Sequence, residues 1–138
     1  LVNNGGLVMT GCNYVISKIT LTEHISLETT VWKGSLDMAA WSVNHEMKPN
    51  TMFVDAGLKA GMTLRLYFDV YDADNKVKLF DGHWGGLFDG AELVPDVSGV
   101  IAISVDDDLA TKLTTLIDWG YSFIVQGTGC TLTKVTIE

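Results

Sequence analysis

One stretch of the chain places an aromatic side chain and two polar ones among glycines. Residues 80–88 read Phe-Asp-Gly-His-Trp-Gly-Gly-Leu-Phe, so Trp84 has Asp81 and His83 beside it. Glycine flanks remove the side chains that would normally bury an indole. Such an indole suits a ligand with a flat, weakly polar face and hydroxyl groups, as a sugar ring has. The alternative is that Trp84 folds back and closes the edge of the core, because Trp is highly buried on average.

Other aromatic and polar side chains are candidates for the same chemistry. Trp119 lies at a predicted junction between helix and strand, where its alternative role is to cap the helix against the core. Trp41 and Trp32 are the next candidates for ligand binding, but for both of them a place in the core is favoured. Asp69, Asp118 and Gln126 add donors and acceptors for a neutral polyol. The predicted ligand-binding residues are Trp84, His83, Asp81, Trp119, Trp41, Tyr67, Tyr71 and Arg65.

The motifs of common catalytic and metal sites are missing from the sequence. A glycosidase needs two carboxylates across a cleft, and the 17 acidic residues form no recognisable constellation of that kind. There is no Gly-x-Ser-x-Gly, His-Glu-x-x-His or phosphate-loop motif. His24 and His45 show no ligand spacing with His83, and the acidic turn at 72–75 lacks the rest of an EF-hand loop. We therefore expect a protein without catalytic activity, metal or cofactor.

Length and charge narrow the class of partner. The chain has 138 residues, 47% of them hydrophobic, which predicts a single packed domain over 1–138. It contains no apolar run of about 18 residues. The net charge of −8 argues against binding to nucleic acid or to an anionic membrane, because both attract basic patches. A neutral partner such as an uncharged glycan fits this charge, and a monomer is expected.

The two ends of the chain carry related features. Residues 1–6 have neither a basic nor an apolar region and are interpreted as a linker end of an excised module. Cys12 and Cys130 would form a disulfide if the end strands are neighbours, and two buried thiols are the alternative. Residues 11–21 also resemble 127–137 in pattern. The two segments are either similar strands of one sandwich, or residues 11–21 are the tail of a preceding, similar module.

The clearest local pattern lies at residues 62–71, where apolar and polar residues alternate strictly. This period of two predicts a half-buried strand with one solvent-exposed face, and that face carries Arg65, Tyr67, Asp69 and Tyr71. The turn at 72–75 is then expected to lead into a hairpin partner at 76–81, with Val77 and Leu79 inward. This hairpin would deliver the Trp84 loop.

The remaining segments are mostly short and rich in β-formers. Strands are predicted at 12–23, 27–33, 51–54, 99–105, 121–126 and 131–138. One helix is predicted over 106–117, because an acidic start precedes leucines at positions 109, 113 and 116. Many short strands, one short helix and frequent turns predict an all-β fold, a β-sandwich or jelly roll.

Several of these motifs together resemble a known family. The chain resembles jelly-roll carbohydrate-binding modules in the order of its motifs. These motifs are 30–34 (Thr-Val-Trp-Lys-Gly), Trp41, the His-Trp-Gly-Gly loop at 79–86, 113–121 and 125–137. Such modules are appended to secreted bacterial plant-polysaccharide hydrolases and occur in surface glycan-binding proteins. The resemblance covers most of the chain from about residue 29 and is closest to the β-glucan and xyloglucan type.

The resemblance implies a non-catalytic module that holds an attached hydrolase on a β-1,4-linked glucan, at the cell surface or outside the cell. The ligands would be cello-oligosaccharides, mixed-linkage β-glucan or xyloglucan. A protein-binding or adhesion sandwich is the main alternative, and a small glycosidase is a weaker one. The glycan hypothesis predicts a groove with polar groups, whereas a protein-binding surface predicts a convex apolar patch.

Overall fold

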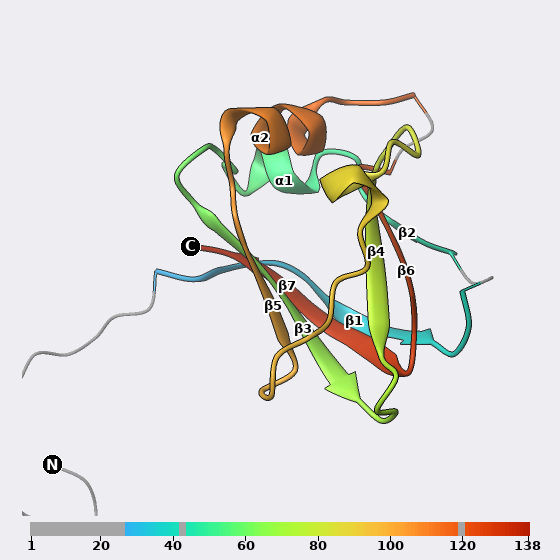
Figure 1. The fold of residues 1–138 in the computed structure, drawn as a ribbon. Coiled ribbons are helices and arrows are strands. Elements are labelled where there is room, and N and C mark those ends of the chain that lie inside the picture. Colours follow the sequence, from blue (N-terminus) through green and yellow to red (C-terminus); the bar gives the residue numbers. More distant parts are fainter. Residues whose placement is uncertain (1–26, 42–43, 119–120) are drawn as a thin grey trace, which may run out of the picture.

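Two antiparallel sheets packed face to face form the protein (Figure 1). The computed structural model describes residues 27–41, 44–118 and 121–138. One sheet has four strands in the order β1-β7-β3-β5, and the other has three in the order β2-β6-β4. The strands are β1 (Thr29–Met38), β2 (Asn44–Met47), β3 (Thr63–Val70), β4 (Lys76–Asp81), β5 (Val100–Ser104), β6 (Phe123–Thr128) and β7 (Cys130–Ile137). This arrangement confirms the predicted β-sandwich.

Consecutive strands lie in different sheets along the whole described chain, so each connection crosses the sandwich. This alternation is the connectivity of a jelly roll. It also makes the predicted hairpin between 62–71 and 76–81 wrong. β3 is a central strand whose two edges already pair with β7 and β5, so it has no hydrogen-bonding edge left for β4. β4 pairs instead with β6 in the opposite sheet.

Two of these crossings run side by side at one corner. The backbone N–H groups of Tyr71 and Asp72, after β3, both donate to the carbonyl of Gly129, between β6 and β7. Gly129 has φ 72°, and a Cβ there would lie 2.8 Å from the Cβ of Asp72. A glycine is needed here because the backbone is left-handed and the two crossings touch.

Side chains that alternate along the strands fill the space between the sheets. Leu64, Leu66 and Phe68 of β3 point inward, as the period-two pattern predicts. Val77 and Leu79 of β4 and Phe123 and Val125 of β6 meet them from the three-stranded sheet. Ile101 and Ile103 of β5 are also buried, which confirms the strand predicted at 99–105.

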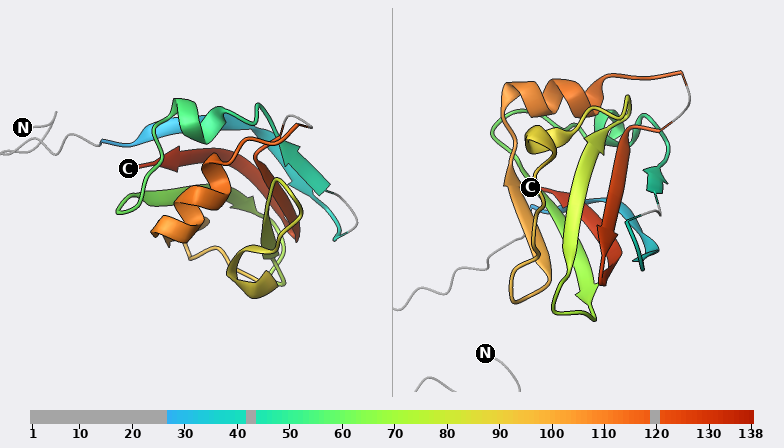
Figure 2. Two further views of the ribbon diagram at one scale, coloured as in Figure 1. Left: turned by 90° about the horizontal axis from the view of Figure 1, so that it is seen from above. Right: turned by 45° about the vertical axis from the view of Figure 1, so that its right-hand side comes forward.

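Short helical segments close one end of the sandwich, above both sheets (Figure 2). Residues 51–54, predicted as a strand, form instead the single-turn helix α1 (Met52–Asp55). Met52 and Phe53 are buried as consecutive residues, which a half-buried strand does not allow. A 3₁₀ turn, η1 (Leu87–Gly90), follows the Trp84 loop.

The predicted helix at 106–117 exists but is shorter. It forms α2 (Asp107–Thr114), and the Asp106 carboxylate caps it by accepting from the Leu109 N–H at 2.8 Å. Leu109 and Leu113 are buried as expected, but the helix ends before Leu116, which is exposed, and Ile117 is buried instead. Among the described residues no helix has the length and apolar character to span a membrane.

Candidate functional site

The outer face of the three-stranded sheet is the surface on which the strongest sequence candidates gather. Because Val77 and Leu79 of β4 point into the core, Lys78 and Phe80 point outward. Register places Gln126 of β6 opposite Lys78, and Ile124 opposite Phe80. Cross-strand partners share a face, so these four side chains form two rows on one surface.

The Trp84 loop closes tightly at one end of this face. The Asp81 carboxylate accepts from the backbone N–H groups of His83 and Gly85, both at 2.8 Å. The Trp84 N–H donates to the Asp81 carbonyl at 3.1 Å, and the Asp81 N–H donates to the Gly85 carbonyl at 2.9 Å. Four bonds within five residues hold Trp84 at φ 64°, in the left-handed region that bulky residues rarely adopt. The role of Asp81 visible here is to shape the loop.

The Trp84 indole is anchored at its edge and remains 41% exposed. Its Nε1–H donates to the Tyr121 hydroxyl at 3.2 Å. Its ring centroid lies 5.8 Å from that of Phe80, at an interplanar angle of 49°. Phe80 in turn belongs to a small cluster with Ile117, Tyr121 and Ile124, apart from the main core. Trp84 therefore does not plug the core but stands over the outer cluster.

Gly82 allows the loop to approach this cluster. A Cβ at Gly82 would lie 2.3 Å from Ile117 Cδ1 and 2.8 Å from the Tyr121 carbonyl oxygen. Figure 1 shows the loop after β4, in yellow, beside the segment that enters β6. The glycines around Trp84 thus serve close packing as well as exposure of the indole.

Trp41 lies next to the same face. The Lys78 ammonium is 5.4 Å from the centroid of the Trp41 ring, and Trp41 is 36% exposed. Lys78 and Lys76 both approach the carboxylate of Glu92, at 3.8 and 3.1 Å. Lys78 is held between an indole and a carboxylate, which orients its ammonium over the sheet.

Amide side chains continue the row that contains Lys78. Asn44 of β2 is the register partner of Gln126, and the Gln126 side-chain amide donates to the Asn44 side-chain oxygen. The row Asn44, Gln126, Lys78 therefore crosses the sheet with donors and acceptors side by side. Trp41 contacts this row, and Trp84 contacts the neighbouring row through Phe80.

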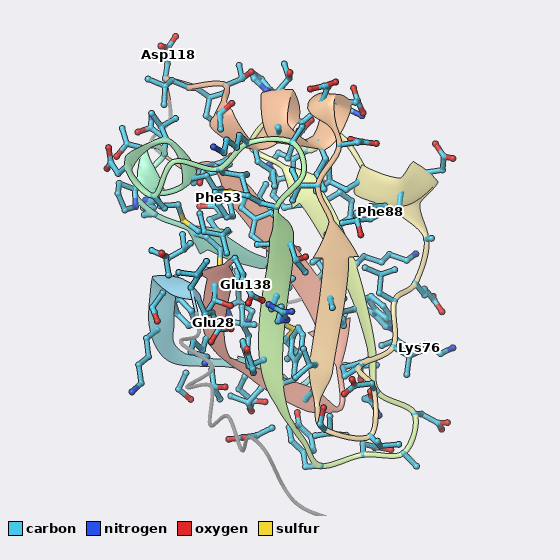
Figure 3. All side chains as sticks on the ribbon, turned by 90° about the vertical axis from the view of Figure 1, so that its left-hand side faces the viewer. Glu28, Phe53, Lys76, Phe88, Asp118 and Glu138 are labelled. Atoms are coloured by element: carbon cyan, nitrogen blue, oxygen red, sulfur yellow. The ribbon has the colours of Figure 1, made fainter. Side chains whose placement is uncertain are left out.

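Arg65 and Tyr67, also predicted for the site, lie on the opposite sheet. The Tyr67 hydroxyl and the Thr136 hydroxyl both donate to the Glu28 carboxylate, and the Lys134 ammonium is 3.8 Å from the Tyr67 ring centroid. Arg65 pairs with Glu138. Figure 3 labels Glu28 and Glu138 on this network. The structure thus separates Arg65 and Tyr67 from the Trp84 loop.

Electrostatics in this network follow from its hydrogen bonds. The hydroxyls of Thr136 and then Tyr67 stabilise the charged carboxylate, so the pKa of Glu28 lies below its usual value. Burial, and next the bond to Glu28, raise the pKa of Tyr67. Arg65 and Tyr67, on the outward face of β3, are therefore both engaged by carboxylates outside β3.

The remaining aromatic candidates have separate places. The Tyr71 hydroxyl donates to the Asp37 carboxylate at 2.8 Å, beyond the end of β3. Trp32 packs against the core, and Gly34 leaves room for its ring, because a Cβ there would lie 2.5 Å from Trp32 Cζ2. Trp119, and the proposed pairing of Cys12, lie outside the described residues. Cys130 is a buried free thiol.

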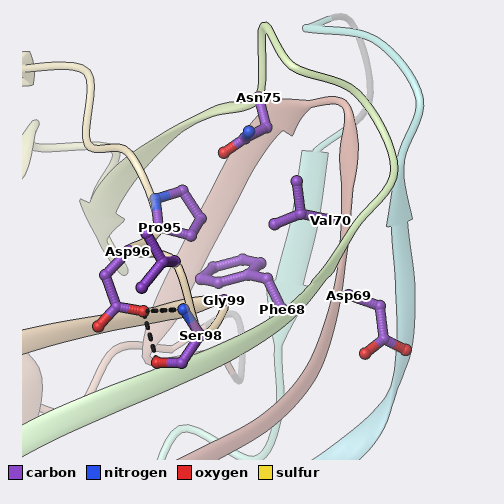
Figure 4. A pocket seen from close by; sticks show the side chains of 9 residues that line it. Phe68, Asp69, Val70, Asn75, Pro95, Asp96, Ser98 and Gly99 are labelled. Carbon is purple, nitrogen blue, oxygen red and sulfur yellow. Dashed lines mark hydrogen bonds between the residues drawn. The ribbon is translucent and has the colours of Figure 1, made fainter.

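A separate open pocket of about 440 Å³ lies between the turn after β3 and the loop before β5, at the end away from the helices (Figure 4). Asp96 caps its own loop by accepting from the Ser98 hydroxyl at 2.6 Å and from the Ser98 and Val100 N–H groups at 2.9 Å. These bonds lower the pKa of Asp96. Among the candidate residues that the structure describes, Asp69 alone lines this pocket.

No group of three His, Cys, Asp or Glu in the described ranges could hold a metal ion.

Comparison with known proteins finds a likeness among solved structures. No protein-family model matches the chain, and no match was found among curated proteins. The fold is similar to part of SGBP-B from the mixed-linkage glucan utilization locus of Bacteroides ovatus, solved with a mixed-linkage heptasaccharide. The TM-score is 0.60, the identity 22%, and the match covers 80% of this chain and 28% of that one. The chain therefore shares its fold with about a quarter of that larger protein.

Several residues of this face were missed by sequence reasoning. Lys78, Phe80 and Asn44 were not proposed, and Tyr121 was expected only as part of a strand. Once Val77 and Leu79 are assigned inward, the alternation itself places Lys78 and Phe80 outward, so this signal was present. The contact of Asn44 depends on strand pairing across the sheet, and that of Tyr121 depends on the packing of the Trp84 loop against the segment before β6. A local pattern contains neither.

Proposed function

We propose that the chain is a non-catalytic carbohydrate-binding module that holds a β-1,4-linked glucan on the outer face of its three-stranded sheet. The observation that carries the proposal is the placement of Trp41 and Trp84. Both indoles are substantially exposed, and both contact outward side chains of the same strand, β4. Mixed-linkage β-glucan, cello-oligosaccharides and xyloglucan are the ligands in this class.

The two indoles contact neighbouring outward positions of one strand. Their contact residues on β4, Lys78 and Phe80, are two positions apart, which is about 7 Å along a strand. A β-1,4-glucan presents apolar C–H faces on successive rings, so one chain would meet both indoles. Each aromatic contact contributes about 1 kcal/mol, by analogy with aromatic pairs. Two contacts with additional hydrogen bonds correspond to dissociation constants of roughly millimolar to micromolar.

The polar row that Trp41 contacts supplies the groups that a neutral polyol needs. Asn44 and Gln126 each carry an amide with donors and an acceptor, and Lys78 adds an ammonium donor. Aromatic rings with polar groups beside them provide the polar contacts that the glycan hypothesis requires, which a purely apolar patch would not. The sandwich shared with SGBP-B, whose structure holds a mixed-linkage heptasaccharide, supports the same ligand class.

The biological setting is part of the proposal. We infer that the module acts as a monomer at the cell surface or outside the cell, attached to a glycoside hydrolase or to a surface glycan-binding protein. Binding would keep the attached protein on plant polysaccharide. The module itself would release no reducing sugar from β-glucan, which separates this proposal from a small glycosidase.

Native affinity electrophoresis tests the function directly. The wild type, Trp84→Ala, Trp41→Ala and Tyr71→Ala run in gels that contain mixed-linkage β-glucan, xyloglucan, hydroxyethyl cellulose, mannan or xylan. We expect β-1,4-glucan to retard the wild type and Tyr71→Ala, and to retard the two tryptophan variants much less. Circular dichroism confirms that each variant is folded.

Two other outcomes would redirect the proposal. Retardation that survives in both folded tryptophan variants would move the site away from this face while keeping the function. Failure of every polysaccharide to retard the wild type would contradict glycan binding and favour a protein-binding sandwich.

A further inference from the structure

The indole N–H of Trp84 is already used inside the protein. It donates to the hydroxyl of Tyr121 at 3.2 Å, and Tyr121 is only 9% exposed. The N–H lies in the plane of the indole, so this bond engages the edge of the ring and not the apolar face on which a sugar stacks. The Tyr121 hydroxyl thus satisfies the one polar group of the Trp84 side chain.

The orientation of the indole is also set before any ligand arrives. The Asp81 carboxylate fixes the amides on both sides of Trp84, Phe80 lies against the ring, and Tyr121 holds its nitrogen. A side chain with three anchors has little rotamer freedom left to lose on binding. Pre-organisation of one side chain is worth about two- to tenfold in affinity.

We propose that Tyr121 is a positioning and specificity-determining residue, which makes Trp84 a rigid, purely apolar platform selective for sugar rings whose hydroxyl groups are all equatorial. This inference rests on the glycan-binding function proposed above. It narrows the ligand to gluco-configured and xylo-configured β-1,4 chains. Tyr121 itself need not touch the sugar.

The selectivity follows from the cost of covering an unpaired hydroxyl. A β-glucose ring has axial hydrogens on both faces, so stacking on an apolar ring covers no polar group. A β-mannose ring has an axial hydroxyl, and successive β-1,4-linked rings alternate in orientation, so neither face of a mannan is free of such groups. An axial hydroxyl pressed against Trp84 would lose water without gaining a partner, so only every second ring of a mannan can stack there without this cost, whereas every ring of a glucan can.

Titration calorimetry with cellohexaose and β-1,4-mannohexaose tests the proposal in three proteins. These are the wild type, Tyr121→Phe and the control Tyr71→Phe, which removes a tyrosine hydroxyl bonded to Asp37 outside the proposed face. We expect the wild type to favour cellohexaose by about twofold or more, because only half of the mannan rings can stack without covering an axial hydroxyl. In Tyr121→Phe the affinity for cellohexaose falls about two- to tenfold, and the preference over mannohexaose narrows. Tyr71→Phe matches the wild type in both.

The outcomes separate this inference from the general function. If the wild type binds cellohexaose and Tyr121→Phe keeps the same affinity and the same preference, the role of Tyr121 is refuted while glycan binding stands. If the wild type binds neither hexaose, the inference fails, and the proposed function fails with it when no polysaccharide retards the wild type in the affinity gels. A change in thermal stability alone, with unchanged preference, would assign Tyr121 a structural role and also refute the inference.

A second measurement needs no variant of Tyr121. Hydrogen exchange of the indole N–H groups is followed by NMR in the wild type, with the Trp84 signal identified by its loss in Trp84→Phe. We expect the Trp84 indole proton to exchange much more slowly than an open indole, both without ligand and with cellohexaose. Exchange at the rate of an exposed indole would overturn the proposal even if Tyr121→Phe did not fold.

Discussion

The Tyr67 hydroxyl donates a hydrogen bond to the Glu28 carboxylate, and this bond joins β3 to the segment just before β1. The Thr136 hydroxyl of β7 donates to the same carboxylate oxygen. Lys134 lies over the Tyr67 ring and 3.7 Å from Glu28. Tyr67 thus fastens the edge of the four-stranded sheet, and the proposed glycan face lies on the other sheet.

Tyr67→Phe is expected to weaken the fold without changing glycan binding. The variant removes one hydrogen bond to a charged, partly buried carboxylate, which costs about 1 to 2 kcal/mol. Urea unfolding of the wild type, Tyr67→Phe and Thr136→Val measures this loss, and affinity electrophoresis measures binding. A drop in β-glucan affinity for Tyr67→Phe comparable to that of Trp84→Ala would contradict the assignment of the two faces.

The lowered pKa of Glu28 predicts how acid affects stability. Hydrogen bonds from Thr136 and Tyr67 favour the charged carboxylate in the folded state, so its folded pKa lies below the unfolded value of about 4.3. A depressed pKa stabilises the fold above the unfolded value, and this contribution is lost as pH falls through the folded pKa. Glu28→Gln should therefore lower the melting temperature at pH 7 and differ progressively less from the wild type below about pH 4. An equal difference at both pH values would count against this role.

Gly85→Ala is expected to disturb the Trp84 platform. A Cβ at Gly85 would lie 2.6 Å from Asp81 Oδ2, so the carboxylate must move away from the two amides that it holds. We expect a severalfold loss of β-glucan affinity and a stability loss of about 1 kcal/mol.

Gly57→Ala is the matched control for that variant. Gly57 has φ 76° with open space around its Cα, so alanine there strains the backbone by about 1 kcal/mol and meets no neighbour. Both variants should lose similar stability in urea, but Gly57→Ala should keep wild-type retardation in glucan gels. Equal loss of affinity in the two would show that stability alone governs binding.

Cys130 is expected to be unreactive in the folded protein. Burial raises the pKa of its thiol to about 11, so little thiolate is present near neutral pH. In a Cys12→Ser variant, which leaves Cys130 as the single cysteine, a thiol reagent at pH 8 should react only after unfolding in urea. Rapid labelling of the native variant would show that the start of β7 opens far more readily than its complete burial implies.

The sequence predicted the class of fold and much of the core. The alternation at 62–71 predicted the inward face of β3, and the leucines at 109 and 113 predicted the buried side of α2. These are local patterns, because burial on one face repeats with the period of the element itself. The exposure of Trp84 was one of two roles that its glycine neighbours left open, and the structure decides for it with an indole that is 41% exposed.

The partners of the strands were decided by tertiary structure. The sequence pattern was compatible with a hairpin between 62–71 and 76–81, but β7, more than 50 residues away, occupies the edge that such a hairpin requires. The same pairing placed Arg65 and Tyr67 on one sheet and the Trp84 loop at the end of β4 in the other. Alternation within a strand tells which side chains share a face, but not which sheet that face belongs to.

The sequence by itself determined the local chemistry of this protein, which is an acidic chain with period-two strands, one capped helix and an indole set among glycines. Only the tertiary structure decided which side chains meet. It brought Trp41 beside Lys78 and Tyr121 beneath Trp84, and it assigned Tyr67 to Glu28. The partners in these contacts are separated by 37 or 39 positions in the sequence. Such contacts depend on how the chain crosses between the sheets, which the packing of the whole core determines and a local pattern cannot predict.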